Sequence, residues 1–516
     1  MLELAVASHI EQQQDTGSVE DPWVWQDDLF SDGDDNDVDD SIMHQLLDTY
    51  MQAASQRYTA PRGRKRRRQD HLVDLLDEYQ HTDRKLFRGL VRMTPTAFED
   101  LVTRLHQTRA FNAGQLERSE VREQVAVALY RFGRSGNGAG FRDIALHCGC
   151  SQGSVNNWTR RTIEALLEIT PEVLTFATED ERSRSARWVS NHVDVPEWSR
   201  GWLVADGTHI PLAWKPALYH VDYFSYKHMY SCNIALVMLP HSLRIVESVV
   251  GHPGTSQDSR VWTSGSQILA KPRLHLDDGE FVWVDGGYGF SPFTVGPFTN
   301  KAADQSRDLS YFNRWLSRIR VRAEHGIAYL KNRFQLLKGY RGNMYRDEDH
   351  CTASKAIQAC IVAHTFASRY DKPDDVADYL LEDYSESDVN EVLSDLQRYE
   401  QATEPARRTW QDNQAQYEAD LAAATEGMSD TQRTQFRVDQ ARDLREEMLR
   451  ALFNHHRREP EDTSVLSRRY ERTIAAYNAM MERQTGSRAR STATSRSQTG
   501  RSQSTQNTNN VASRAQ

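Results

Sequence analysis

Two apolar segments of the chain each run directly into an Asp-Gly pair. The segment LVA leads into Asp206 and Gly207, and VWV leads into Asp285 and Gly286. Short runs of branched and aromatic residues bounded by glycine predict buried strands, and an acid at such a strand end is costly unless something compensates it. Two carboxylates brought side by side at a sheet edge need a cation between them. Hard oxygen ligands select Mg²⁺ or Mn²⁺, so we expect a metal site at this edge.

The surrounding residues, 185–368, predict an α/β domain. Further β-rich segments are YSCNIALVML and LRIVESVVG, and helical segments are SQDSRVWTSGSQIL and YFNRWLSRIRVRAEHGIAYLKNRFQLL. Three strands, a helix, a strand and a helix in this order are typical of an α/β core.

A third acid lies on the last predicted helix. The apolar stripe of this helix faces the core, and Glu324 lies at the edge of the stripe, near the strand ends. Arg320 and Lys331 share its helix face, as expected of a metal site beside a phosphate backbone. His209 and Lys227 are further candidates for contacting a phosphate.

A fourth acid, Asp258, lies in HPGTSQDSRVW at or just before a helix. An Asp in the first turn of a helix is often only a capping or dipole residue. Taken alone, the position of Asp258 does not distinguish a cap from a metal ligand.

Residues 70–170 are predicted to be helical and to contain a helix-turn-helix. Its helices are expected at Val121–Phe132, Phe141–Cys148 and Ser151–Leu167, with Ser151 as a cap. Arg160 and Arg161 on the last helix suit phosphate contacts. A small helical bundle that only packs against the catalytic core is the alternative.

The chain carries a net charge of −10, but its charges are segregated. Residues 1–60 predict an acidic disordered leader, and 486–516 a disordered basic tail. Residues 61–69 hold six basic side chains in seven positions, which indicates nuclear import or a phosphate-contacting arm. Residues 371–485 predict charged helices without evident chemistry.

Two negative features bound the setting of the chain. Its five cysteines are scattered and odd in number, which favours free thiols in a reducing compartment. The sequence contains no apolar stretch of the roughly 18 residues that span a bilayer, so we expect no membrane contact.

Four segments in order resemble the DDE nucleases of the PIF/Harbinger transposase superfamily, over Trp202–Phe366. They are ADGTHIPL, GHPGTSQDSRVW, VWVDGGYGFSPFTVGPF and FNRWLSRIRVRAEHGIAYLKNRF. The last segment resembles the family's long helical motif of Arg, Glu, Leu, Lys, Arg and Phe. Thr255 stands where the family usually has Ser.

The resemblance implies an RNase H-like core that cuts or joins double-stranded DNA with two divalent ions. Asp206, Asp285 and Glu324 would be catalytic metal ligands, and Asp258 an additional ligand. It also implies a nuclear protein, with a Myb-like accessory protein and a homo-oligomer among its partners. The alternatives are a domesticated DNA-binding regulator that keeps the nuclease fold without cutting, and an interaction scaffold built on residues 371–485.

Overall fold

The computed structural model describes residues 43–51, 71–112, 120–289, 291–399 and 410–460. The chain divides into two compact units, Met1–Arg68 and Gln69–Gln516. The first unit has one described helix, at residues 43–51. The basic run at 61–69, most of the acidic leader and the basic tail lie outside the described residues. No helix among those described combines the length and apolarity needed to cross a membrane.

The second unit begins with a set of short helices whose starts follow from capping. The Thr94 hydroxyl accepts from Ala97 N with Pro95 in the first turn, and Ser151 caps the last helix of the set. The Ser151 cap confirms the sequence prediction. These helices are α3 His71–Thr82, α4 Arg84–Val91, α5 Pro95–His106, α6 Arg109–Asn112, α7 Val121–Phe132, α8 Phe141–His147 and α9 Gln152–Glu168.

A five-stranded mixed sheet forms the centre of the unit, in the order β3-β2-β1-β4-β5. β1 pairs antiparallel with β2, β2 antiparallel with β3, β1 parallel with β4, and β4 parallel with β5. The sheet with its many helices is compatible with an α/β nuclease core. The strands are β1 Gly201–Pro211, β2 Ser231–Met238, β3 Ile245–Pro253, β4 Phe281–Trp283 and β5 Thr294–Val295.

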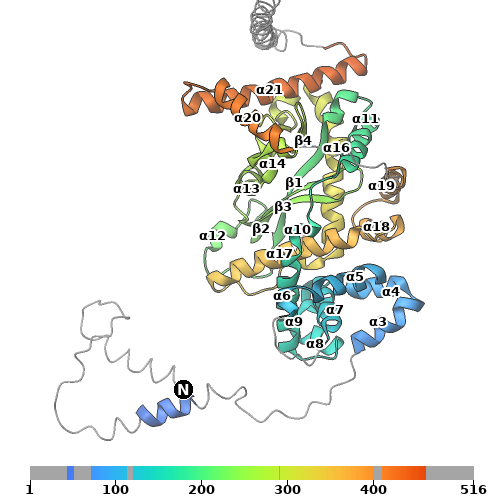
Figure 1. Cartoon of the computed structure of the whole chain (residues 1–516), viewed down its shortest axis with the longest axis vertical. Helices are drawn as coiled ribbons and strands as arrows, with labels where there is room; N and C mark the ends of the chain where they lie inside the picture. The colour runs from blue at the N-terminus through green and yellow to red at the C-terminus, as the bar shows by residue number, and fades with distance from the viewer. Residues whose placement is uncertain (1–42, 52–70, 113–119, 290, 400–409, 461–516) are drawn as a thin grey trace, which may run out of the picture. The chain divides into compact units, whose positions relative to one another are not determined.

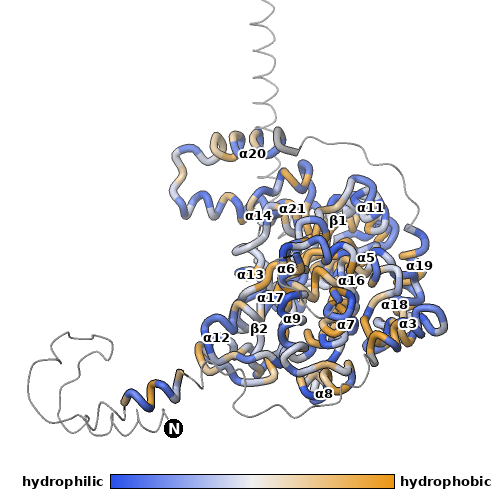
Figure 2. Tube along the Cα trace, turned by 60° about the horizontal axis from the view of Figure 1, so that its bottom comes forward, coloured by the Kyte–Doolittle hydropathy of each residue, from blue (hydrophilic) through white to orange (hydrophobic). Residues whose placement is uncertain are grey.

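The long helix α16 (Arg307–Arg333) packs on the sheet and joins it to the elements around it (Figure 1). Its apolar side chains include Ile319 and Ala323, which are fully or almost fully buried. Gly326 allows a close approach to β2, because a side-chain carbon there would come within 2.3 Å of Met238 Sδ. Figure 2 shows apolar stretches gathered around α16 and hydrophilic turns on outer helices such as α11.

The remaining elements surround the sheet and complete the second unit. The longer ones are α11 Glu179–Val193, α13 Asp258–Gly265, α15 Asn300–Gln305, α17 Asp347–Ser368, α18 Pro373–Leu380, α19 Glu386–Tyr399, α20 Trp410–Ala424 and α21 Asp430–His455. The shorter ones are α10 Thr170–Val173, α12 His220–Tyr223, α14 Gln267–Ala270, η2 Gly136–Ala139, η3 Pro196–Arg200, η4 Pro272–Leu274, η5 Gly286–Tyr288 and η6 Gln335–Lys338.

The charged region after residue 370 is packed against α16 instead of standing apart. The guanidinium of Arg322 pairs with Asp395 of α19, and that of Arg333 pairs with Asp371 before α18. Both arginine side chains are almost completely buried. The part of the predicted helical region from residue 461 to 485 lies outside the described residues.

Candidate active site

Asp206 and Asp285 come from neighbouring parallel strands. The pairing of β1 with β4 ends at Val204 and Trp283, so each acid lies two residues beyond the last paired residue of its strand. Each carboxylate accepts from the next backbone amide, Gly207 N at 2.8 Å and Gly286 N at 2.7 Å. The two Asp-Gly segments therefore reach the same edge of the parallel part of the sheet.

The prediction that the first strand ends at Asp206 was wrong. β1 does not end at Asp206 but continues to Pro211, because its other edge stays paired with β2. The Asp-Gly pair marks only the point where β1 loses its β4 neighbour.

The carboxyl group of Asp206 is held in an environment that disfavours its charge. Burial raises its pKa to about 7, while Arg320 and the Gly207 amide act in the opposite direction. Asp285 and Asp258 raise the pKa of Asp206 further, because their charges repel its own. The three aspartates thus lie within electrostatic reach of one another.

Asp258 is fixed against the backbone beside Asp206. It is the first residue of α13, and its Oδ1 accepts from Asn233 Nδ2 at 2.8 Å. A side-chain carbon on Gly207 would come within 2.5 Å of this oxygen, so only glycine allows the approach. The helix start predicted at Asp258 is confirmed, and its carboxylate points to the strand instead of capping the helix with its side chain.

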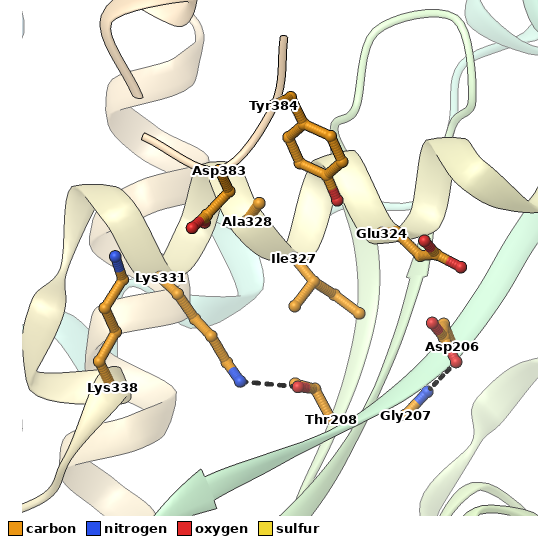
Figure 3. Close-up of a pocket in the computed structure, with 10 residues that line it drawn as sticks. All are labelled: Asp206, Gly207, Thr208, Glu324, Ile327, Ala328, Lys331, Lys338, Asp383 and Tyr384. Carbon is orange, nitrogen blue, oxygen red and sulfur yellow. Dashed lines mark hydrogen bonds between the residues drawn. The ribbon is translucent and has the colours of Figure 1, made fainter. Parts of the chain in front are cut away.

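Glu324 projects from α16 into a cavity of about 370 Å³ that Asp206 also lines. In Figure 3 the two carboxylates face each other across this cavity. The cavity is lined by Asp206, Gly207, Thr208, Glu324, Ile327, Ala328, Lys331, Lys338, Asp383 and Tyr384.

Lys331 supplies a half-buried cation to this cavity. Its Nζ donates to Thr208 Oγ1 at 2.7 Å and to the His209 carbonyl at 2.9 Å. Burial, with Lys227 and Lys338 nearby, lowers the pKa of Lys331 to about 8. An ammonium held in place on the same side of α16 as Glu324 could bind an anionic group such as a phosphate.

Residues 205–364 match the family model described as DDE superfamily endonuclease. This matched segment contains Asp206, Asp258, Asp285 and Glu324, and it supports an enzyme of the nuclease type in general terms. Endonucleases of this family generally use divalent metal ions. A search of curated proteins and a search of solved structures found no match.

The donor set of the matched segment fits divalent metal ions of the hard class. All four acids offer carboxylate oxygens, and two buried polar atoms beside them have no hydrogen-bond partner among the described residues. These atoms are Asn233 Oδ1, on the residue that holds Asp258, and the hydroxyl of Tyr288. Burial raises the pKa of Tyr288, and the negative charges of Asp206, Asp258 and Asp285 raise it further. The amide oxygen of Asn233 could accept a hydrogen bond from water bound in the site, and the hydroxyl of Tyr288 could donate or accept one.

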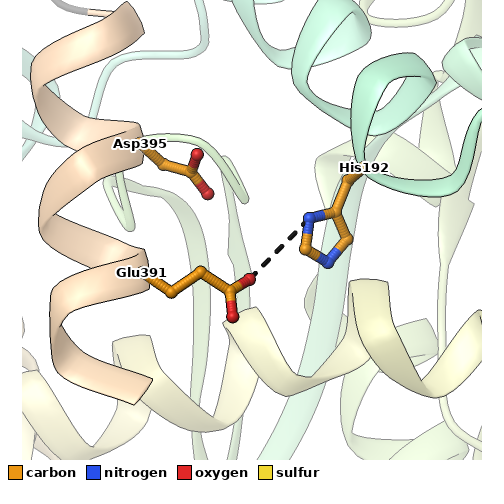
Figure 4. A group of neighbouring side chains, drawn as sticks. All are labelled: His192, Glu391 and Asp395. Carbon is orange, nitrogen blue, oxygen red and sulfur yellow. Dashed lines mark ion pairs between the residues drawn. The ribbon is translucent and has the colours of Figure 1, made fainter. Parts of the chain in front are cut away.

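Within the described part of the chain, the four acids do not converge on one point. The group whose ligand atoms all lie within 4.8 Å of one another is His192, Glu391 and Asp395, away from the cavity (Figure 4). Arg322 pairs with both of these acids, so one guanidinium already offsets part of their negative charge. We interpret this group as an ion-pair cluster that fixes α19 on α16.

Arg320, predicted to contact phosphate, lies inside the acidic site. Its Nη2 is 3.2 Å from Asp285 Oδ1, and the side chain of Asp285 is 45% exposed. Arg320 therefore balances part of the charge of the aspartates in the structure as it stands.

The other predicted side chains lie at different distances from the site. His209 is buried with its Nδ1 3.0 Å from Ser231 Oγ, and Lys227 is exposed. Arg160 is exposed on α9 in the helical region, whereas Arg161 donates to Gln124 at 2.9 Å. The structure does not bring these two arginines into the cavity.

Sequence reasoning missed the contribution of residues beyond 370. Asp383 and Tyr384, between α18 and α19, line the cavity with the catalytic candidates. Asn332 Nδ2 donates to Asp383 Oδ2 at 2.9 Å, and Tyr384 packs edge-on against His325. The sequence carries no signal for this placement, because it depends on how α19 docks on α16.

Proposed function

We propose that this protein is a divalent-metal-dependent DNA endonuclease of the PIF/Harbinger transposase type, which transfers phosphoryl groups on DNA. The observation that carries the proposal is that Asp206 of β1 and Glu324 of α16 face one cavity that also contains the Lys331 ammonium. A site for DNA cleavage needs acids for metal ions and a cation for the phosphate, and this cavity offers both.

Bound Mg²⁺ or Mn²⁺ ions, two of them in the proposed mechanism, would activate a water or a 3′-hydroxyl and would stabilise the charge of the leaving oxygen. Asp206, Asp285 and Glu324 would hold the ions through their carboxylates. Asn233 and Gly207 keep Asp258 beside Asp206, ready to complete a ligand shell. Lys331, fixed by Thr208, would hold the scissile phosphate.

The strand order and the mixed pairing support an RNase H-like fold for the core. The helices α7, α8 and α9 support a helix-turn-helix, since the first turns of α9 present exposed polar residues and Arg160. We propose that the nuclease core and the helix-turn-helix both bind double-stranded DNA. A homo-oligomer, a Myb-like accessory protein and nuclear import through residues 61–69 belong to the same proposal.

The test is metal-dependent nicking of DNA that carries terminal repeats. Asp206→Asn and Glu324→Gln should each reduce Mn²⁺-dependent nicking to background while the affinity for the same DNA is kept. Asp304→Asn, an equal charge change at an exposed position of α15, serves as the control. If both site variants still cleaved DNA, Asp206 and Glu324 could not be the catalytic metal ligands.

One observation favours a second candidate, a DNA-binding regulator that does not cut. Arg320 already supplies a cation to Asp285, so the acids can be balanced in part without a metal ion. A titration of the unmodified protein with Mn²⁺ distinguishes the two candidates, because the regulator binds DNA but shows no cation-dependent nicking at any concentration.

A further inference from the structure

The connection between β1 and β2, residues 212–230, exposes an unusual number of aromatic side chains. The exposed fractions are 54% for Trp214, 60% for Tyr219, 44% for Phe224 and 75% for Tyr226. Tyr345, on the loop before α17, is 63% exposed. A concentration of large exposed apolar side chains marks an interaction site more often than chance exposure does. We call these five residues the aromatic platform.

The backbone under the platform is anchored. Ala213 N donates to the Tyr340 carbonyl and Ala217 N to the Met344 carbonyl, each at 2.8 Å. Farther along, Ser225 N donates to the Met229 carbonyl at 2.9 Å and closes a tight turn. The rings are therefore presented by a fixed frame, which lowers the entropy lost when a flat partner binds.

Cations are interleaved with the exposed rings. The guanidinium of Arg341 lies 5.1 Å from the ring centre of Trp214, and the ammonium of Lys227 lies 5.6 Å from that of Tyr226. Lys215 is exposed beside Trp214. Aromatic faces alternating with positive charge match a ligand that combines flat bases with a phosphate backbone.

The platform is continuous with the candidate active site. The ring of Tyr226 packs edge-on against that of His209, with centres 5.4 Å apart, and the neighbouring Thr208 lines the cavity. Lys227 is close enough to Lys331 to lower the pKa of that cavity lysine, after burial itself. Lys331 and Tyr226 thus both contact His209, Lys331 through the backbone carbonyl and Tyr226 through the ring. In Figure 1 α12, within this connection, lies at the outer edge of the unit beyond β2.

We propose that the aromatic platform stacks unpaired nucleobases of a DNA strand that leaves the cavity. This inference rests on the proposed function, since it assigns to the same site a preference for DNA whose end is unpaired. An apolar protein partner or a second copy of the chain would also cover exposed rings. The interleaved lysine and arginine side chains and the continuity with the cavity favour the nucleic acid.

The experiment uses the full chain without divalent metal, so that no cleavage intervenes. Two duplexes of the same sequence are compared, one blunt and one with a forked end of unpaired bases that include 2-aminopurine. Binding is measured by fluorescence anisotropy, and stacking by quenching of the 2-aminopurine. Trp214→Ala and Tyr226→Ala are compared with the ring-preserving Tyr226→Phe and with Leu86→Ala, which removes an exposed apolar side chain on α4.

The unmodified protein should bind the forked duplex more tightly than the blunt one and quench the reporter. Each alanine variant should lose roughly five- to hundredfold in affinity for the forked duplex, the range for one stacked base, with little change for the blunt duplex. Tyr226→Phe and Leu86→Ala should behave like the unmodified protein.

Two results would overturn the proposal. One is equal affinity of all variants for the forked duplex. The other is a change confined to the sedimentation coefficient, which would assign the platform to a second copy. The proposed function is tested separately, because Lys331→Ala should weaken both duplexes; if it weakens neither, the cavity itself does not bind DNA.

Discussion

The side-chain amide of Asn233 donates both to the carboxylate of Asp258 and to the carbonyl of Ser256, each at 2.8 Å. Asn233 is 1% exposed and lies on β2, between β3 and β1. A neutral amide in this position sets the direction of an acid without competing for a cation.

Asn233→Ala should weaken Mn²⁺ binding by about ten- to a hundredfold, the usual effect of losing a group that orients a ligand. Isothermal titration calorimetry without DNA measures the affinity. The melting temperature without metal shows how much of the effect is merely structural, and Asn191→Ala on α11 is the control. An unchanged Mn²⁺ affinity in a folded Asn233→Ala variant would exclude Asp258 from the metal site.

The acidic turn between α18 and α19 should weaken DNA binding. Glu382 pairs with Lys338 at 3.0 Å, and Asp383 lines the cavity with Lys331. Glu382→Gln with Asp383→Asn should tighten duplex binding roughly threefold to tenfold, because Lys338 loses its partner and the negative charge of Asp383 near Lys331 is removed. Binding measured at several salt concentrations should also show a steeper salt dependence.

The matched control for this turn is Glu386→Gln combined with Asp388→Asn, which makes the same charge change on the first turn of α19. If both double variants bound the duplex with equally increased affinity, only the net charge would matter. The position of the turn at the cavity would then have no effect on DNA binding.

The stability of the second unit should fall in mild acid because of a buried histidine. Burial lowers the pKa of His241 from 6.5 to about 3, with Arg184 and Arg244 acting in the same direction and Asp180 against them. The unfolded chain therefore binds a proton that the folded chain does not. The contribution of the neutral ring is complete above pH 6.5 and is lost as the pH falls toward 3.

Within this window His241 should add about 1.4 kcal/mol per pH unit to the slope of unfolding free energy against pH. His241→Phe should remove that increment, whereas His106→Phe, at an exposed position of α5, should keep it. Urea denaturation at a series of pH values measures the slopes. Parallel slopes for all three proteins would contradict the prediction.

The ion pair between Arg322 and Asp395 should be structurally essential. The Arg322 side chain is 1% exposed, and Asp395 also accepts from Trp188 Nε1 at 2.8 Å. Asp395→Ala leaves a buried charge without its partner, which should cost about 3 kcal/mol or more. Glu391→Ala, whose side chain is 60% exposed, should cost less than about 1 kcal/mol. Chemical denaturation of both variants measures their unfolding free energies, and equal losses would contradict the prediction.

Much of the sheet could be predicted because its signals are local. The apolar segments that end in Asp206 and Asp285 indicate strands, and the start of a helix at Asp258 follows from the polar residues before it. The two-residue strand β5 was not predicted, since Thr294 and Val295 are too few to form a pattern. The helix predicted to run to residue 337 ends at Arg333, and a 3₁₀ turn follows.

The parts of the candidate site that could not be predicted depend on contacts between distant segments. Asn233 lies in an apolar strand, and the sequence alone gives it no role. Its role depends on α13, which places Asp258 within hydrogen-bond distance of it. Asp383 and Tyr384 look like a solvated turn until α19 docks on α16. In each case the chemistry comes from tertiary packing, which periodicity and local propensity do not encode.

The docking of residues 371–399 on α16 has a consequence during protein synthesis. When a ribosome has just released the segment that carries Glu324, the buried Arg322 and Arg333 still lack Asp395 and Asp371. The helix bearing Glu324 can settle only after these later residues have emerged. In a nascent chain the cavity is therefore complete only once Asp383, Tyr384 and Asp395 have also emerged.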